Sequence, residues 1–280
     1  KKACDDGLGV GITLGARQQT MSEIKHCGTL NMRPPRVHVG GCREGRARLC
    51  FRPLIKYWSW RRMEHTSEGY PEPGALYLRP TRYLDFDVEI VRDFADEAIE
   101  GAAGDVEKAV KLYYAVRDKV RYDPYFMSGN PDDYRASYVL SAGAGFCIQK
   151  AVLLAACTRA VGIPTGVGLS DVTNHMCSER LLSIMAGKTL FIHHGYAVMY
   201  LDGKWVKAAP AFNIELCDRF QVEPTEFDGG SDALFQEFDK KGRRHMVYES
   251  DHGIWSDYPH ERVTTDFRDY YPDTIYEDCA

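Results

Sequence analysis

The sequence lacks several features that would place it in a well-defined class. No apolar run reaches the roughly 18 residues that a membrane-spanning helix needs, so no membrane partner is expected. Nine cysteines are spread thinly with no CxxC pair, which speaks against both a disulfide framework and a zinc site. Phosphate-binding and dinucleotide-binding glycine motifs are absent too, and no cofactor is expected. Unpaired thiols fit a reducing cytoplasm, which is the predicted compartment.

Charge is distributed unevenly along the chain. Residues 1–64 hold 13 Lys and Arg against five Asp and Glu, whereas the remainder holds 22 against 35. A basic arm can bind nucleic acid, but this segment has no sustained hydrophobic period. We therefore predict that residues 1–73 are an unstructured N-terminal segment and do not expect nucleic acid as a partner. A break rich in Pro and Gly over residues 67–80 places the folded unit at 74–280.

Hydrophobic periodicity predicts helices first and paired strands later, which is typical of an α+β protein with an antiparallel sheet. The predicted helices cover residues 85–104, 105–122, 134–145, 147–161, 178–187 and 213–220. A strand is predicted at residues 165–172, and a hairpin at 189–212 turns at Asp202–Gly203. A second hairpin is predicted at residues 234–250.

The predicted helix 147–161 is apolar nearly all round, which is typical of a helix inside a core. Gly162 and Pro164 end it. Cys147 opens it, where free N–H groups and the helix dipole favour a thiolate. A nucleophilic Cys147 should then have a thiol pKa below the free value of about 8.5. The alternative is a buried thiol that only fills space, and Cys157 in the same helix is given that interpretation.

Two glycines precede this cysteine, and two histidines are candidates for its base. Gly143 and Gly145 let the backbone approach closely, as an oxyanion hole built from N–H groups requires. His193 and His194 stand at the entry of the predicted hairpin. With a two-residue turn His194 shares a face with Tyr196, whereas His193 points the other way. On residue type alone both could equally be surface or half-buried histidines.

No metal site is expected. The other histidines that follow the glycine-rich turn, among them His175, His245 and His252, lack the carboxylate or cysteine spacing of a metal site.

Two separate stretches together resemble a known family. "GFCIQKAVLLAACTRAVGIP" followed by "HGYAVMYLDGKWVKAAP" resembles the core of the transglutaminase-like superfamily over about residues 80–260. That papain-like group includes transglutaminases, peptide N-glycanases and many microbial hydrolases. Its pattern is G-x-C opening a helix that ends R-A-x-G-I-P, then a histidine eleven residues before the tryptophan of a hairpin. The resemblance implies Cys147 as the nucleophile, His194 as the general base and Trp205 as that tryptophan.

The third catalytic residue of the family is not matched. The family has an aspartate four residues after the tryptophan, where this chain has Ala209. Asn213 could orient His194, since papain-like enzymes use Cys-His-Asn, although it could equally be a helix N-cap. Asp171 or Asn174 could reach from a neighbouring strand, or no third member exists.

The sequence therefore predicts a papain-like, transglutaminase-like fold in which the helix of the nucleophile packs against an antiparallel β-sheet. The expected activity is cysteine-dependent hydrolysis or acyl transfer on an amide or peptide substrate, with Cys147, His194 and Asn213 as catalytic residues. A catalytically inactive binding module that has lost the family aspartate is the alternative.

Overall fold

The computed structural model describes residues 69–235 and 237–271. Most of the predicted N-terminal segment 1–73 lies outside these residues, so the proposed boundary at 74 stays a prediction. Of that segment, Tyr70 and Pro71 contact the folded unit. The Tyr70 hydroxyl donates to Asp251 at 3.0 Å, and the Pro71 carbonyl accepts from the Trp205 indole at 2.8 Å. The first short helix, η1, then spans Ala75–Tyr77.

The molecule combines helices with an antiparallel sheet, as predicted. The four strands have the order β5-β4-β3-β6. Their bounds are Thr165–Asn174 (β3), Leu190–Leu201 (β4), Lys204–Ala208 (β5) and Met246–Trp255 (β6). Two short strands, β1 (Arg121–Tyr122) and β2 (Ala144–Gly145), pair in parallel just before the helix that contains Cys147. Central position in the sheet thus falls to β4 and β3, which carry the predicted histidines and Asp171.

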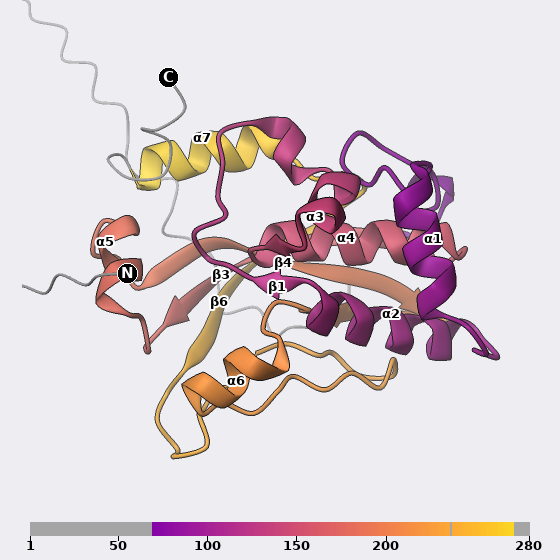
Figure 1. Ribbon diagram of the computed structural model, residues 1–280. Coiled ribbons are helices and arrows are strands. Elements are labelled where there is room, and N and C mark those ends of the chain that lie inside the picture. Colours follow the sequence, from indigo (N-terminus) through magenta and orange to yellow (C-terminus); the bar gives the residue numbers. More distant parts are fainter. Residues whose placement is uncertain (1–68, 236, 272–280) are drawn as a thin grey trace, which may run out of the picture. The chain divides into compact units, whose positions relative to one another are not determined.

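Most helices precede the four-stranded sheet in sequence, and three of them pack on a fourth, α4 (Cys147–Ala160). α1 (Glu89–Ala98), α2 (Asp105–Lys119) and α3 (Ala136–Ala142) pack on α4, and α4 packs along β4 (Figure 1). A short helix η2 (Pro131–Tyr134) precedes α3. α5 (Glu179–Ile184), α6 (Ile214–Phe220) and α7 (His260–Tyr270) follow β3, β5 and β6. None of the helices in the described part of the chain has the length and apolar character needed to cross a bilayer.

Helix α4 forms as the sequence predicts. Phe146 is extended, and its N–H donates to the side chain of Gln149 at 3.1 Å, so the helix begins at Cys147. All residues from Cys147 to Arg159 are buried. Gly162 ends the helix in the left-handed region at φ +87°, which costs glycine little. The core of the molecule is therefore built around α4.

The hairpin of β4 and β5 also has the predicted register. Asp202 and Gly203 both have positive φ, as a two-residue turn of type I′ requires, and Leu201 faces Lys204. At the other end of β4 the pairing with β3 shifts. Ser170 faces His194 and Val172 faces Phe191, so β4 has one residue more than β3 in this interval. This is a β-bulge, and it includes His193.

The C-terminal part differs from the prediction in two respects: the second hairpin is short, and one helix was not predicted. The second hairpin predicted at 234–250 is present only as a short antiparallel turn, in which Phe238 bridges to Arg244 and the N–H groups of Asp239 and His245 donate to the carbonyls of Arg243 and Glu237. The strand β6 pairs instead with β3, because the sheet offers that edge for a full antiparallel ladder. Helix α7 was not predicted, and it supplies Asp266 to the site described next.

Candidate active site

Cys147 lies in the wall of a cavity. It is the first residue of α4, it is 9% exposed, and it lines a cavity of about 620 Å³. The same cavity is lined by residues of the loop 121–127, by the beginning of β4 and by the aromatic side chains Phe212, Phe220 and Phe235. The nucleophile predicted from sequence therefore faces a space large enough for a peptide segment.

A close approach of two backbones holds Cys147 beside the predicted base. Gly195 follows His194 directly, and a Cβ at this glycine would lie 2.6 Å from Cα of Ile148. Only glycine allows β4 to lie so close to the first turn of α4. The backbone N–H of Gly195 also acts on the sulfur of Cys147, in the direction that lowers the pKa of the thiol. The residue after the histidine thus brings the strand and the nucleophile together.

Lys150 anchors the same turn of α4 from the inside. Its Nζ donates to the backbone carbonyls of Arg117, Val120 and Ala211 at 2.6–2.9 Å. Burial lowers its pKa to about 7. Sequence reasoning passed over this residue, although a lysine within an otherwise apolar helix was the signal that it has internal partners.

The electrostatics of Cys147 differ from the sequence-based prediction. Burial raises the pKa of its thiol to about 11, although the N–H groups of Gly195 and Ile148 act in the opposite direction. The prediction of a lowered pKa counts the helix N-terminus and a charged His194 imidazole, but not desolvation by the surrounding elements. In the substrate-free site Cys147 is therefore a neutral thiol.

His194 is buried among aromatic rings. It is 7% exposed and lines the cavity that contains Cys147. Its ring centroid lies 4.9 Å from that of Phe235 and 5.9 Å from that of Tyr248. Burial lowers its pKa to about 3, so the imidazole is neutral in the substrate-free site. Its Nε2 has no hydrogen-bond partner among the described residues.

None of the proposed third members orients His194 in this structure. The side chain of Asn213 accepts from the N–H of Tyr122 and donates to Glu215, and it forms no N-cap bond. Asp171 accepts instead from the ring of His252, from Ser250 and from the N–H of His193. In this structure the amide of Asn213 is held by Tyr122 and Glu215, so its role as the orienting residue stays a prediction.

The remaining positions of that prediction have other roles. Asn174 caps the turn that follows β3, because its Oδ1 accepts from the N–H of Met176 at 2.9 Å. Ala209, which stands in place of the family aspartate, is 1% exposed and packs with Tyr77, Tyr196 and Trp205 in an apolar cluster. A carboxylate at that position would be buried against rings rather than beside the imidazole.

His193 was expected to lie away from the site, but it lines the same cavity as Cys147. It is 3% exposed, its φ is +57°, and its Nε2 lies 2.7 Å from Oδ2 of Asp266 on α7. Burial lowers the pKa of His193, and the adjacent carboxylate of Asp266 opposes that shift. The bulge in β4 explains the difference, since an extra residue re-aims the side chains beside it.

Unsatisfied polar groups are concentrated around this cavity. Three buried ring nitrogens without a partner in the described residues line it: Nδ1 of His193, Nε2 of His194 and Nδ1 of His245. Buried polar atoms are nearly always paired in stable proteins, so unpaired ones mark a place where a ligand or a reacting group completes the pairing.

The two glycines before Cys147 have local structural reasons. Gly143 ends α3 at φ +63°, and a Cβ at Gly145 would come within 3.1 Å of Cβ of Gln149. The backbone N–H groups that act on the sulfur are those of Gly195, Ile148 and Cys147 itself.

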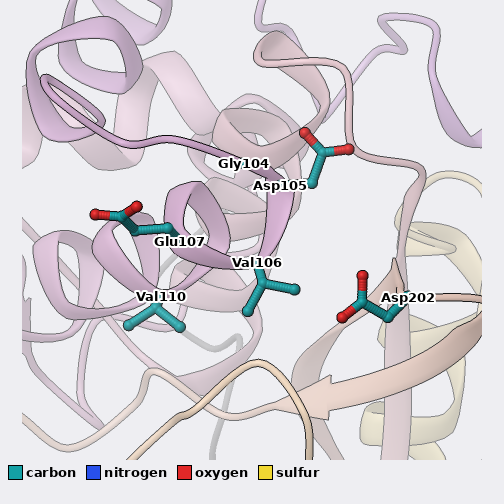
Figure 2. Close-up of a pocket in the computed structure, with 6 residues that line it drawn as sticks. All are labelled: Gly104, Asp105, Val106, Glu107, Val110 and Asp202. Atoms are coloured by element: carbon teal, nitrogen blue, oxygen red, sulfur yellow. The ribbon is translucent and has the colours of Figure 1, made fainter.

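A second hollow lies elsewhere on the surface and shares no lining residue with the first. Figure 2 shows it between the start of α2 and the hairpin turn, lined by Asp105, Glu107, Asp202, Val106, Val110 and Gly104. It contains carboxylates but neither a thiol nor an imidazole. The candidate active site is therefore the cavity that contains Cys147.

Comparisons with known proteins agree with the motifs. Residues 92–210 match the family described as the transglutaminase-like superfamily, a span that includes Cys147 and His194. No curated protein matches the chain. A candidate cysteine protease from Cytophaga hutchinsonii is 16% identical, with a TM-score of 0.37 and 64% of this chain and 53% of that one covered.

A candidate protease from Parabacteroides distasonis is also 16% identical, with a TM-score of 0.28 and 45% of this chain and 25% of that one covered. The chain thus spans about half the length of the first solved structure and a quarter of the second. Both likenesses are weak, and the assignment depends on the family match. The region of the chain that contains Cys147 and His194 therefore resembles the transglutaminase-like superfamily.

Proposed function

We propose that the protein is a cysteine-dependent hydrolase of amide or peptide bonds, with Cys147 as the nucleophile and His194 as the general base. One observation carries the proposal. The thiol of Cys147 and the imidazole of His194, whose Nε2 has no partner among the described residues, line one cavity, and the backbone N–H of the next residue, Gly195, acts to lower the pKa of the thiol. A nucleophile and a neutral base in one cavity are what acyl transfer needs.

The chemistry proceeds from two neutral groups. As the sulfur of Cys147 attacks the carbonyl carbon, its proton passes to the imidazole of His194. The C–S bond forms, and the carbonyl electron pair moves to the oxygen, which the N–H groups near the sulfur stabilise. Collapse of this intermediate breaks the C–N bond, and the imidazolium protonates the leaving amine. Water then attacks the thioester, His194 takes its proton and returns it to the sulfur, and the carboxylic acid product leaves.

Water is the proposed acceptor because no described feature forms a dedicated amine site. Transamidation differs only in the second step, where an amine replaces water. The two reactions separate in water enriched in oxygen-18. Hydrolysis places one heavy oxygen in each new carboxylate, whereas transamidation places none.

The test is direct detection of the thioester. The protein is mixed with a panel of peptide amides, quenched in acid and examined by mass spectrometry for an acyl adduct on the peptide that contains Cys147. We expect an adduct that hydroxylamine removes and that Cys147→Ala lacks, while the control Cys177→Ala keeps it. Cys177 is a partly exposed thiol in the same chain. An adduct on Cys177 alone would contradict the proposal.

The alternative is a binding module that has lost catalysis, and one observation favours it. Ala209 removes the family aspartate, and the contacts of His194 shown here are to aromatic rings. Such a module would bind a peptide in the cavity without forming an adduct. Saturable binding of the same peptides with no acyl adduct would support this alternative and exclude the enzyme.

A further inference from the structure

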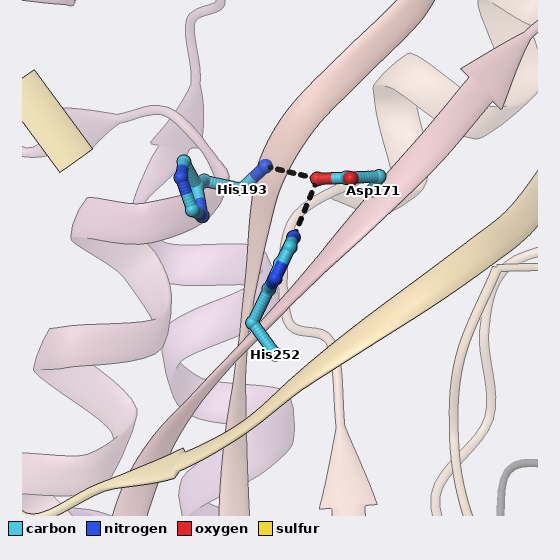
Figure 3. A group of neighbouring side chains, drawn as sticks. All are labelled: Asp171, His193 and His252. Carbon is cyan, nitrogen blue, oxygen red and sulfur yellow. Dashed lines mark hydrogen bonds and ion pairs between the residues drawn. The ribbon is translucent and has the colours of Figure 1, made fainter. Parts of the chain in front are cut away.

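Three side chains with metal-binding groups converge beside the active-site cavity. Asp171 comes from β3, His193 from β4 and His252 from β6, which are adjacent strands in the sheet (Figure 3). One potential ligand atom from each lies within 4.8 Å of the others. The three residues are far apart in sequence, which is why the spacing of the histidines indicated no metal site. The order of the strands brings them together.

Asp171 is held in a fixed orientation at the centre of the group. Its Oδ1 accepts from the backbone N–H of His193 at 3.1 Å, and its Oδ2 accepts from the hydroxyl of Ser250 at 2.9 Å. The ring of His252 reaches the same Oδ1 through Nε2 at 2.7 Å. The first two bonds come from donors that a bound cation would leave in place. They therefore act as an outer layer that orients the carboxylate.

His193 supplies the independent observation that points to a ligand. It is 3% exposed, and its Nδ1 is a buried atom without a hydrogen-bond partner in residues 69–235 and 237–271. Its other ring nitrogen, Nε2, lies 2.7 Å from the carboxylate of Asp266. With the proton on Nε2 shared with Asp266, the lone pair is on Nδ1. A histidine whose second nitrogen donates to a carboxylate is the common arrangement of a metal-binding imidazole.

The backbone of His193 is consistent with a functional constraint. Its φ of +57° is uncommon for a residue other than glycine, and it falls in the bulge of β4. Strained backbone is retained where a side chain must be aimed at a particular point. The ring of His193 also lies 4.8 Å from that of His252, measured between centroids. The strain thus brings two imidazoles together over one carboxylate.

We propose that Asp171, His193 and His252 bind one divalent cation of the zinc type. Two imidazoles and one carboxylate suit zinc and its neighbours rather than magnesium or calcium, which prefer oxygen ligands. Zinc bonds of about 2.0–2.2 Å require ligand atoms closer together than 4.8 Å, so the rings rotate slightly on binding. The bond between His252 and Asp171 gives way to two bonds to the cation. The fourth position is left for water.

The cation would tie β3, β4 and β6 together at the edge of the cavity that contains Cys147, because His193 lines that cavity. The site does not depend on the proposed hydrolysis, and it is testable in a protein without the nucleophile. In the Cys147→Ala background, zinc binding reports on the three ligands alone.

The experiment measures zinc binding by the full chain with Cys147→Ala, after removal of metal with a chelator. Competition against a chromophoric zinc indicator gives the stoichiometry and the affinity. We expect one site that His252→Ala and Asp171→Asn each weaken by about 100-fold or more, and that Asp266→Asn weakens by about 10–100-fold as an orienting residue. His175→Ala is the matched control, because His175 is an exposed histidine outside the group.

Cobalt in place of zinc identifies the ligand atoms, since thiolate ligands give an intense charge-transfer absorption that imidazole and carboxylate lack. We expect a cobalt spectrum without that absorption, and melting curves of His252→Ala and His175→Ala that resemble the parent's when metal is absent. No bound zinc, a thiolate spectrum, or equal weakening by His252→Ala and His175→Ala would each overturn the proposal.

Discussion

The two ends of helix α4 differ in how their polar groups are satisfied. At the first turn, Cys147 lines a cavity next to imidazole nitrogens that have no partner in the described part of the chain. At the last turn, Arg159 is 2% exposed and its guanidinium is fully engaged. It donates to the carbonyls of Thr165 at 2.7 Å, Arg79 at 2.8 Å and Ser256 at 2.7 Å. The polar groups beside the first turn thus lack partners among the described residues, whereas the arginine of the last turn forms three hydrogen bonds to backbone carbonyls.

The two cysteines of α4 show the same difference. Burial raises the pKa of both thiols, and Cys157 is completely buried in the core. Burial alone therefore does not distinguish the proposed nucleophile from a packing residue. The two differ because Cys147 lines a cavity that His194 also lines, whereas Cys157 does not. Both Cys147 and Arg159 lie in the stretch that resembles the family motif. We propose a catalytic role for the first turn of α4, whereas the hydrogen bonds of Arg159 stabilise the last turn.

Exchange of the two cysteines for alanine should separate activity from stability most strongly. Cys147→Ala removes the nucleophile, so we expect amidase activity to fall by about 10⁴-fold or more while the melting temperature stays near the parent's. Cys157→Ala leaves a small core cavity, so we expect a loss of about 1 kcal/mol in the free energy of unfolding and retained activity. Kinetic assays and denaturant melts of both variants measure this. Loss of activity in Cys157→Ala with retained activity in Cys147→Ala would contradict the proposal that Cys147 is the nucleophile.

Replacement of the two neighbouring histidines tests which imidazole serves Cys147. His194→Ala removes the general base, and we expect a rate loss of about 10²–10⁴-fold. His193→Ala, measured in a buffer with chelator, should cost less than His194→Ala. The comparison of kcat/KM for the two variants decides this. A larger loss for His193→Ala would make His193 the base, with Asp266 as its orienting residue.

At the stable end of α4, Arg159→Met leaves three carbonyls without their donor, and that of Thr165 is buried. We expect a loss of about 1–3 kcal/mol in the free energy of unfolding, because an unsatisfied buried group costs about that much. Arg159→Lys should recover part of this loss, since an ammonium can reach one or two of the carbonyls. Urea melts of the parent and both variants give the values. A neutral Arg159→Met would show that the hydrogen bonds contribute little.

The close contact between α4 and β4 is tested with Gly195→Ala. The added Cβ would meet Cα of Ile148 at 2.6 Å, so the strand and the first turn of α4 must move apart. A shift of about 1 Å in a catalytic group costs about 10²-fold in rate. Gly104→Ala is the control, because nothing lies within 4 Å of its added Cβ. Equal activity of the two variants would mean that the contact does not position Cys147.

Local signals predicted the parts of the fold that depend on neighbours in sequence. The apolar run ending at Gly162 gave α4, and the Asp202–Gly203 turn gave the hairpin with its register. The parts that depend on distant pairing were missed. β6 pairs with β3 across some 80 residues, and α7 brings Asp266 to His193. These contacts form only once the sheet has assembled, so no pattern among neighbouring residues in the sequence predicts them.

The same limit applies to two predictions about the site. The pKa of Cys147 was predicted too low because a helix terminus is visible in the sequence, whereas desolvation depends on elements that pack around it later. Asn213 is a candidate third member because it follows Ala209 by four residues and because papain-like enzymes use Cys-His-Asn. Its side chain instead hydrogen-bonds to Tyr122 and Glu215. The contact with Tyr122 could not be predicted, because the two residues are 91 positions apart in the sequence.

The pH dependence of acylation at Cys147 tests the central claim most directly. With a thiol pKa of about 11 and an imidazole pKa of about 3, both groups are neutral between these values. Transfer of the proton from Cys147 to His194 during attack then gives a rate that is nearly flat from pH 6 to 9. In His194→Ala only the thiolate reacts, so the rate should rise about tenfold per pH unit over that interval. If the parent rises in the same way and overlays His194→Ala, Cys147 is not served by His194 and the account fails.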